Sequence, residues 1–235
     1  MGNELFKNIP SKVGDLVKDV RNGRIGLPDL QRPFVWKDNK VRELFDSMLK
    51  GYPIGYIMLW ESPADYESKK SAIGDNSKTY EEPKELVIDG QQRLTSMYRS
   101  LYGKDAVATT NDKRVAISRF YYLDMNTCLD PEADRYDAIV SVPEDRRIKE
   151  NFDRDVKLDL STRELEYEHE MYPANILFDS SAATQWLLGY MAFHQSSPDA
   201  MAKFNKFQQD VIETITSYRL PVITMDKSTP REAVC

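Results

Sequence analysis

Five consecutive residues place a carboxylate, two amides and a guanidinium in one short stretch: Asp89, Gly90, Gln91, Gln92 and Arg93. The planar guanidinium of Arg93 is permanently charged and can bind a phosphate through two parallel hydrogen bonds. Asp89 could hold Mg²⁺ directly or through water, and Gln91 or Gln92 could orient a water molecule. Nucleotide hydrolysis depends mainly on such positioning and on charge neutralisation. These five residues, called the DGQQR turn below, are therefore a candidate phosphate site.

The sequence around the DGQQR turn predicts the elements that would position it. Glu85–Ile88 is typical of a short, mostly apolar strand, and Gly90 can adopt a positive φ without steric cost. Apolar residues then recur at helical spacing, at Leu94, Met97, Tyr98 and Leu101. Gly103 is a candidate for the glycine that ends this helix. The unpaired N–H groups of a helix N-terminus suit phosphate. The alternative is an ordinary strand–helix corner with exposed polar side chains.

A second polar pair, Gln31 and Arg32, lies in the proline- and aromatic-rich segment Pro28–Trp36. Two prolines fix backbone angles on either side of the pair, and two stiff aromatic side chains follow it. One interpretation is a loop held in a defined conformation for binding. The other is a loop that its aromatic side chains pin into the core, with Arg32 pairing a carboxylate.

Several common classes of site find little support in the sequence. There is no G-x-x-x-x-G-K-[ST] loop and no G-x-G-x-x-G element. The two cysteines, Cys128 and Cys235, are far apart, which indicates neither a disulfide framework nor a thiolate zinc site. His169 and His194 are the only histidines, so a zinc site or a Ser-His-Asp triad is poorly supported.

The composition indicates a folded protein that is not built for holding DNA in general. The chain has 235 residues, of which 41% are hydrophobic and 30% charged, and a formal net charge of −6. A protein that binds DNA non-specifically usually carries a basic face, so DNA contact here is expected to be selective or supplied elsewhere. No apolar run is long enough for a membrane span, and the N-terminus has no signal core. We therefore expect a cytoplasmic protein that does not contact a membrane.

Hydrophobic periodicity and turn residues predict further elements. The predicted helices are Val13–Val20 ending at Asn22-Gly23, a helix from an Asp38 N-cap to Gly51, a short one near 161–168, Ala183–Phe193, and a longer one from Pro198 or Asp199. The predicted extended segments are Ile25–Leu30, Tyr56–Trp60, Val115–Leu123, Ile139–Val142 and Leu220–Met225. The polar segment Pro63–Pro83 is typical of a long surface loop or insertion.

These elements predict an α+β fold in which a small mixed sheet carries the DGQQR turn. We expect an α/β core over residues 1–143 and a mainly helical continuation of the same domain over residues 144–235. Thr229, Pro230 and Glu232 match the start of a helix, with a capping box that opens just before Cys235. Because a helix of one turn is not stable by itself in water, we expect the chain to be a truncated part of a longer protein.

Two segments together resemble a known family: Gln31–Trp36 (QRPFVW) and the DGQQR turn. They are similar to the motifs of the DGQQR domain, the N-terminal domain of GmrSD-type modification-dependent restriction enzymes and related phage-defence proteins. The Gly51–Gly55 connection and the strand at Leu220 also fit, so the resemblance spans most of the chain. The two motifs at this spacing are more specific than either alone.

The resemblance implies a nucleotide-binding core with a ParB/sulfiredoxin-like fold that binds and hydrolyses an NTP with Mg²⁺ and so controls DNA restriction. The residues it implies for nucleotide binding are Gln31, Arg32, Asp89, Gly90, Gln91, Gln92 and Arg93. Asp89, Gln92 and Arg93 are the candidate catalytic residues, and Asp89 is the candidate metal ligand.

The resemblance also implies partners for the full-length protein. These are DNA, which can be modified, and a C-terminal nuclease domain that this chain lacks; homo-oligomerisation is left open. Two alternatives remain: a DNA-recognition module that binds DNA phosphates without hydrolysis, and a ParB-like nuclease. The net negative charge disfavours the first. The shortage of histidines and of a dense carboxylate cluster disfavours the second.

Overall fold

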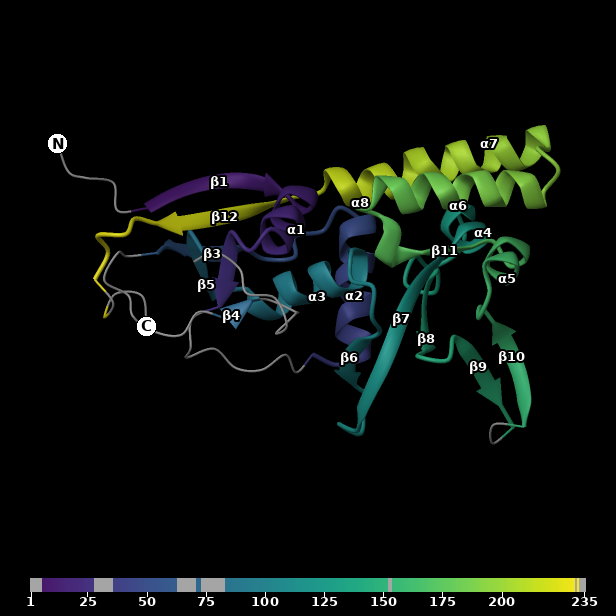
Figure 1. Ribbon diagram of the computed structural model, residues 1–235, viewed down its shortest axis with the longest axis horizontal. Helices are drawn as coiled ribbons and strands as arrows, with labels where there is room; N and C mark the ends of the chain where they lie inside the picture. Colours follow the sequence, from purple (N-terminus) through teal and green to yellow (C-terminus); the bar gives the residue numbers. More distant parts are fainter. Residues whose placement is uncertain are drawn as a thin grey trace. The chain divides into compact units, whose positions relative to one another are not determined.

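The structure, a computed structural model, describes residues 6–27, 36–62, 71–72, 83–151, 154–230 and 232 (Figure 1). These residues form an α+β fold with more than one sheet, which confirms the fold class predicted from the sequence. The chain divides into two compact units: unit 1 is Met1–Phe34, Pro53–Tyr98 and Ser217–Cys235, and unit 2 is Val35–Tyr52 and Arg99–Thr216. Both units combine segments that are far apart in the sequence. The domain boundary expected at residue 143 stays a prediction.

Unit 1 is built on a six-stranded sheet with the order β1-β12-β3-β5-β2-β4. Its strands are β1 (Phe6–Lys12), β2 (Ile25–Leu27), β3 (Ile57–Glu61), β4 (Ser71–Ala72), β5 (Glu85–Asp89) and β12 (Arg219–Met225). The pairs β12–β3 and β2–β5 are parallel, and the other neighbouring strands are antiparallel. The sheet is therefore mixed, as expected, and the DGQQR turn begins at the end of its inner strand β5.

Helix α1 (Val13–Arg21) is the helix that the spacing of its apolar residues predicts. It buries Val13, Leu16, Val17 and Val20, the four residues that the sequence assigned to its inner face. The helix ends at Asn22, and Gly23 adopts a φ of 72°, which glycine reaches without a Cβ clash.

Unit 2 contains a second sheet, in which the long strand β7 (Ala116–Asp124) is central. It pairs with β6 (Val107–Thr110), β8 (Ile139–Pro143) and β11 (Met171–Pro173), all antiparallel. A separate hairpin is formed by β9 (Arg147–Glu150) and β10 (Asp155–Asp159). The helices are α2 (Asp38–Leu49), α4 (Met125–Leu129), α5 (Arg163–Glu168), the 3₁₀ turn η1 (Ala174–Ile176), α6 (Ser180–Phe193), α7 (Pro198–Phe207), the π-helical segment η2 (Gln208–Ile212) and α8 (Glu213–Ser217), which ends at the unit boundary.

The helical half of unit 2 is held together by aromatic side chains. Trp186 of α6 stacks on Tyr190 with ring centroids 5.2 Å apart, and it forms a T-shaped pair with Tyr172 of β11 at a centroid distance of 4.9 Å. Phe204 and Phe207 of α7 complete the cluster. Such ring pairs stabilise a core by about 0.5–1.5 kcal/mol each beyond their buried area.

One local prediction needs correction, and one strand was not predicted. Asp38 is not an N-cap: it is the first residue of α2, Lys37 precedes it as the cap, and the Asp38 carboxylate accepts hydrogen bonds from elsewhere in unit 2. Helix α3 (Gln91–Leu101) ends just before Gly103, as predicted, and Gly103 does so without a positive φ. Strand β1 was not predicted, because its residues are almost all exposed and show no alternation.

Residues after 143 contain the predicted helices and also strands that periodicity did not reveal, β9, β10 and β11. Most of the loop predicted at Pro63–Pro83 lies outside the residues that the structure describes; within it, Ser71–Ala72 pairs with β2. Among the described residues, no helix combines the length and the apolar character that crossing a membrane requires. The cytoplasmic location stays a prediction.

Candidate phosphate site at the DGQQR turn

The DGQQR turn joins β5 to α3, as its sequence predicted. Asp89 is the last residue of β5, Gly90 forms the turn with a φ of 86°, and α3 begins at Gln91. The Gly90 N–H donates to Oδ1 of Asp89 at 2.7 Å, and the Leu94 N–H donates to the Gly90 carbonyl at 2.9 Å. The exposed end of the strand and the first turn of the helix therefore form one hydrogen-bonded corner.

Gly90 is needed for its conformation and also for its lack of a side chain. A Cβ at this position would lie 2.6 Å from Cδ1 of Ile57 and 2.9 Å from the carbonyl oxygen of Tyr56. Both distances are shorter than ordinary contacts, and one of the atoms belongs to the backbone. The corner thus packs directly on the start of the neighbouring strand β3.

Replacing Gly90 with alanine is expected to lower the free energy of unfolding by about 1–3 kcal/mol, because the new side chain forces both a strained φ and a clash. Urea unfolding measures the change. Gly51→Ala is the matched control, since Gly51 has a φ of 68° with no atom within 4 Å of the added Cβ. Gly90→Ala should cost more than Gly51→Ala; equal costs would mean that the close packing on β3 has no energetic weight.

Arg93 is held by backbone and by an aromatic ring. Its Nη1 donates to the carbonyl oxygen of Tyr56, and its guanidinium carbon lies 5.8 Å from the Tyr56 ring centroid. A Cβ on Gly55 would lie 2.7 Å from the same Nη1, so Gly55, with a φ of 93°, leaves room for the guanidinium. Within the described residues Arg93 forms no ion pair with a carboxylate. Its positive charge is therefore not neutralised there.

Tyr56 is a residue of this corner that the sequence did not single out. Its hydroxyl donates to the Asp89 carboxylate, and that hydrogen bond raises the Tyr56 pKa above its usual value. Tyr56 thus contacts both charged residues of the DGQQR turn, Asp89 through its hydroxyl and Arg93 through its carbonyl. The only sequence signal was its place beside Gly55, at the end of the GYPIG connection.

The other predicted site residues divide into two groups. Gln91 is buried, with 7% of its surface exposed, whereas Gln92 is half-buried and is therefore the amide better placed to reach a ligand. Gln31 and Arg32 lie outside the described residues, so their approach to the turn stays a prediction. Asp89 is exposed, and no cluster of three or more potential metal ligands occurs in the described part of the chain.

Comparison with known proteins gives the family. Residues 13–235 match the N-terminal domain of the GmrSD restriction endonucleases, and this match includes both motifs discussed above. The chain belongs to this family. The family is that of the N-terminal domains of restriction endonucleases, which is the family that the two motifs resemble.

The chain is also similar to an uncharacterized protein of Methanocaldococcus jannaschii. The two are 26% identical over 222 residues, which cover 91% of this chain and 35% of the relative. The chain thus spans about a third of the length of the curated relative that it matches. Activities of a whole restriction protein are accordingly proposals for this domain.

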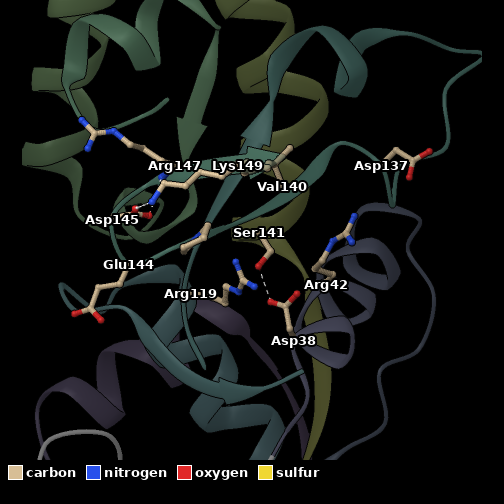
Figure 2. A pocket seen from close by; sticks show the side chains of 12 residues that line it. Asp38, Arg42, Arg119, Asp137, Val140, Ser141, Glu144, Asp145, Arg147 and Lys149 are labelled. Carbon is tan, nitrogen blue, oxygen red and sulfur yellow. Dashed lines mark hydrogen bonds and ion pairs between the residues drawn. The ribbon is translucent and has the colours of Figure 1, made fainter. Parts of the chain in front are cut away.

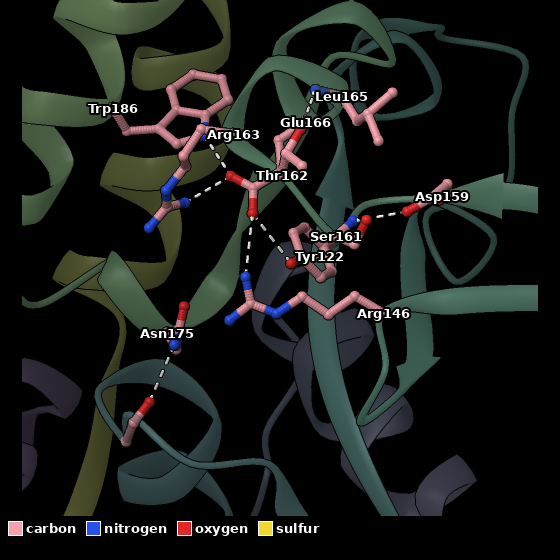
Figure 3. Close-up of polar contacts among 11 residues, drawn as sticks. Tyr122, Arg146, Asp159, Ser161, Thr162, Arg163, Leu165, Glu166, Asn175 and Trp186 are labelled. Atoms are coloured by element: carbon pink, nitrogen blue, oxygen red, sulfur yellow. Dashed lines mark hydrogen bonds and ion pairs between the residues drawn. The ribbon is translucent and has the colours of Figure 1, made fainter.

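This GmrSD N-terminal domain contains a second polar cluster, inside unit 2, that the sequence analysis missed (Figure 3). The Glu166 side chain is fully buried, and its carboxylate accepts from the Tyr122 hydroxyl at 3.1 Å, from Nε1 of Trp186 at 3.0 Å and from Nη1 of Arg163 at 2.5 Å. Nη1 of Arg146 lies 3.7 Å away. Burial raises the Glu166 pKa, which its partners only partly oppose. These contacts join β7, α5 and α6, so the cluster stabilises the fold.

Proposed function

We propose that the DGQQR turn binds the phosphate groups of a nucleotide, and that this domain hydrolyses an NTP to control DNA cleavage by a nuclease domain elsewhere in the full-length protein. The observation that carries the proposal is the position and the charge environment of the Arg93 guanidinium. Its guanidinium is fixed by the Tyr56 carbonyl, and no carboxylate in the described residues neutralises it. An oriented, uncompensated guanidinium at a helix N-terminus suits a phosphate.

Each residue of the turn has a distinct proposed role. Arg93 neutralises phosphate charge, and the backbone N–H groups after Gly90 add the positive end of the α3 dipole. Gln92 orients the attacking water. The Gly90 N–H fixes Oδ1 of the Asp89 carboxylate, and this carboxylate holds the metal ion.

The donor set fits Mg²⁺ only when a nucleotide is bound with it. Mg²⁺ in nucleotide sites is held by one or two carboxylates together with the phosphates, and Asp89 supplies one carboxylate. When bound, Mg²⁺ would neutralise negative charge on the phosphates. Gln31 and Arg32 are proposed to approach from the first motif, and a ParB/sulfiredoxin-like core remains part of this proposal.

The decisive experiment is a titration of the purified chain with ATP, GTP, CTP and UTP, with and without Mg²⁺. Calorimetry measures affinity, and a phosphate-release assay measures hydrolysis. We expect Mg²⁺-dependent binding of at least one NTP, with slow release of phosphate. Binding without hydrolysis would restrict the role to nucleotide sensing. Binding of a DNA duplex with no affinity for any NTP would overturn the proposal in favour of a DNA-recognition module.

A further inference from the structure

Unit 2 contains a cavity of about 840 Å³ that the proposed function does not use (Figure 2). It lies where the first residue of α2 meets β7, β8 and the start of β9. Its charged and hydroxyl lining residues are Asp38, Arg42, Arg119, Asp137, Ser141, Glu144, Asp145, Arg147 and Lys149. A volume of 300–1,000 Å³ is typical of small-molecule sites.

Arg119, from the middle of β7, is the unusual member of this lining. Its Nε is buried and has no hydrogen-bond partner in the described part of the protein. A buried donor without an acceptor is unfavourable, and such groups in folded proteins nearly always have a partner. Arg119 therefore lines the cavity with a guanidinium for which no hydrogen bond to the described residues is found at Nε.

The other basic residues of the lining already have partners. Arg42 donates to the backbone carbonyls of Ile139 and Tyr136, at 2.7 and 3.1 Å. Arg147 binds Asp159 at 2.8 Å, and Lys149 binds Asp145 at 2.8 Å. Arg119 is thus the cation of the lining that is best placed to bind an incoming anion.

The cavity lining also contains hydrogen-bond acceptors, of which Asp38 is one. Oδ1 of Asp38 receives both the Tyr121 hydroxyl, at 2.9 Å, and the Ser141 hydroxyl, at 2.6 Å. Its Oδ2 receives no hydrogen bond from the described residues. Figure 2 shows Arg119, Ser141 and Asp38 near one another, with Glu144 to one side of them. The cavity therefore offers one anion-binding group beside carboxylates that accept hydrogen bonds.

We propose that this cavity is a second binding site, in unit 2, for a small molecule of about mononucleotide size that carries an oxyanion and hydroxyl or amino groups. Arg119 binds the oxyanion, and Asp38 and Glu144 accept from the hydroxyl or amino groups. Acidic and basic residues are equally numerous in the lining, which favours such a mixed ligand over a bare polyanion such as a nucleic acid backbone. The proposal does not depend on nucleotide binding at the DGQQR turn.

Calorimetric titration with inorganic phosphate, ribose 5-phosphate and AMP tests the proposal. We expect ribose 5-phosphate and AMP to bind more tightly than phosphate. Arg119→Met should weaken all three by about ten-fold or more, since it removes the charge-assisted hydrogen bonds. Arg119→Lys keeps the positive charge but lacks the planar guanidinium. Its affinity for each probe should therefore lie between those of the unchanged protein and Arg119→Met. Glu144→Gln should weaken the two sugar-bearing probes and leave phosphate binding unchanged.

Two controls separate this site from the DGQQR turn and from general charge effects. Arg154→Met removes an exposed arginine outside the lining and should change nothing. Arg93→Ala should leave ribose 5-phosphate binding intact even if it abolishes NTP binding. Arg119→Met should keep the melting temperature of the free protein, because it removes a donor without a protein partner. The proposal is overturned if none of the probes binds, if Arg119→Met binds them like the unchanged protein, or if it only lowers the melting temperature.

Discussion

Replacing Arg93 with alanine is expected to weaken NTP binding by about ten-fold to a hundred-fold while leaving the fold intact. A charge-assisted bidentate contact contributes about 1.5–3 kcal/mol, and about 1.4 kcal/mol corresponds to a ten-fold change in affinity. The effect on stability should be small, because Arg93 is only partly buried and its described protein contacts are one carbonyl and one ring face. Calorimetry and thermal unfolding of the same samples measure both quantities.

Arg93→Lys should restore only part of the lost affinity, because an ammonium keeps the charge but lacks the planar fork. Arg24→Ala is the matched control in unit 1: Arg24 lies 3.9 Å from Asp19 and 3.8 Å from Glu85, so its loss changes the net charge equally but removes surface ion pairs. It should leave NTP affinity unchanged. Normal NTP affinity of Arg93→Ala together with a large drop in melting temperature would make Arg93 a structural residue.

The sequence predicted those parts of the DGQQR turn and its flanking elements that depend on residues close together in the chain. A short apolar strand, a glycine and a helical stripe determined β5, the Gly90 turn and α3, because each depends on side chains a few residues apart. The contact of Tyr56 with Asp89 and Arg93 could not be predicted in this way. It depends on the antiparallel register of β3 and β5, in which Met58 pairs with Asp89, and no local pattern specifies that register.

Long-range contacts also explain the error at Asp38. An aspartate before an apolar stripe is typical of an N-cap. The Asp38 carboxylate instead accepts hydrogen bonds from the hydroxyls of Tyr121 and Ser141, which lie 83 and 103 residues away in the sequence. Strands β9 and β10 were not predicted, for a different reason. Their residues are mostly exposed and charged, so they lack the alternation that identifies a half-buried strand.

Replacing Glu166 with alanine is expected to lower the free energy of unfolding by about 3–5 kcal/mol, the range for removing one partner of a buried ion pair. The buried Trp186 N–H and Tyr122 hydroxyl would lose their acceptor, and two arginines would lose a counter-charge. Glu166→Gln should cost less, because the amide oxygen still accepts a hydrogen bond. Urea unfolding measures both variants.

Glu168→Ala is the matched control, since Glu168 lies in the same helix α5 but is exposed. Surface substitutions of this kind usually change stability by less than about 0.5 kcal/mol. A similar small cost for Glu166→Ala would mean that the cluster joining β7, α5 and α6 does not stabilise the fold.

The pH dependence of the Glu166→Gln cost tests whether burial or the arginines dominate at this carboxylate. Burial raises the folded-state pKa of Glu166 above its ordinary value of 4.5, so the folded protein binds the proton more tightly than the unfolded chain. The stabilisation from this proton is fully present below the unfolded-state pKa and is lost as the pH rises through the folded-state pKa. The stability advantage of the unchanged protein over Glu166→Gln should therefore shrink as the pH rises above 4.5 and then become constant. An advantage that grows with pH would show that Arg163 and Arg146 outweigh burial and that Glu166 is held as an anion.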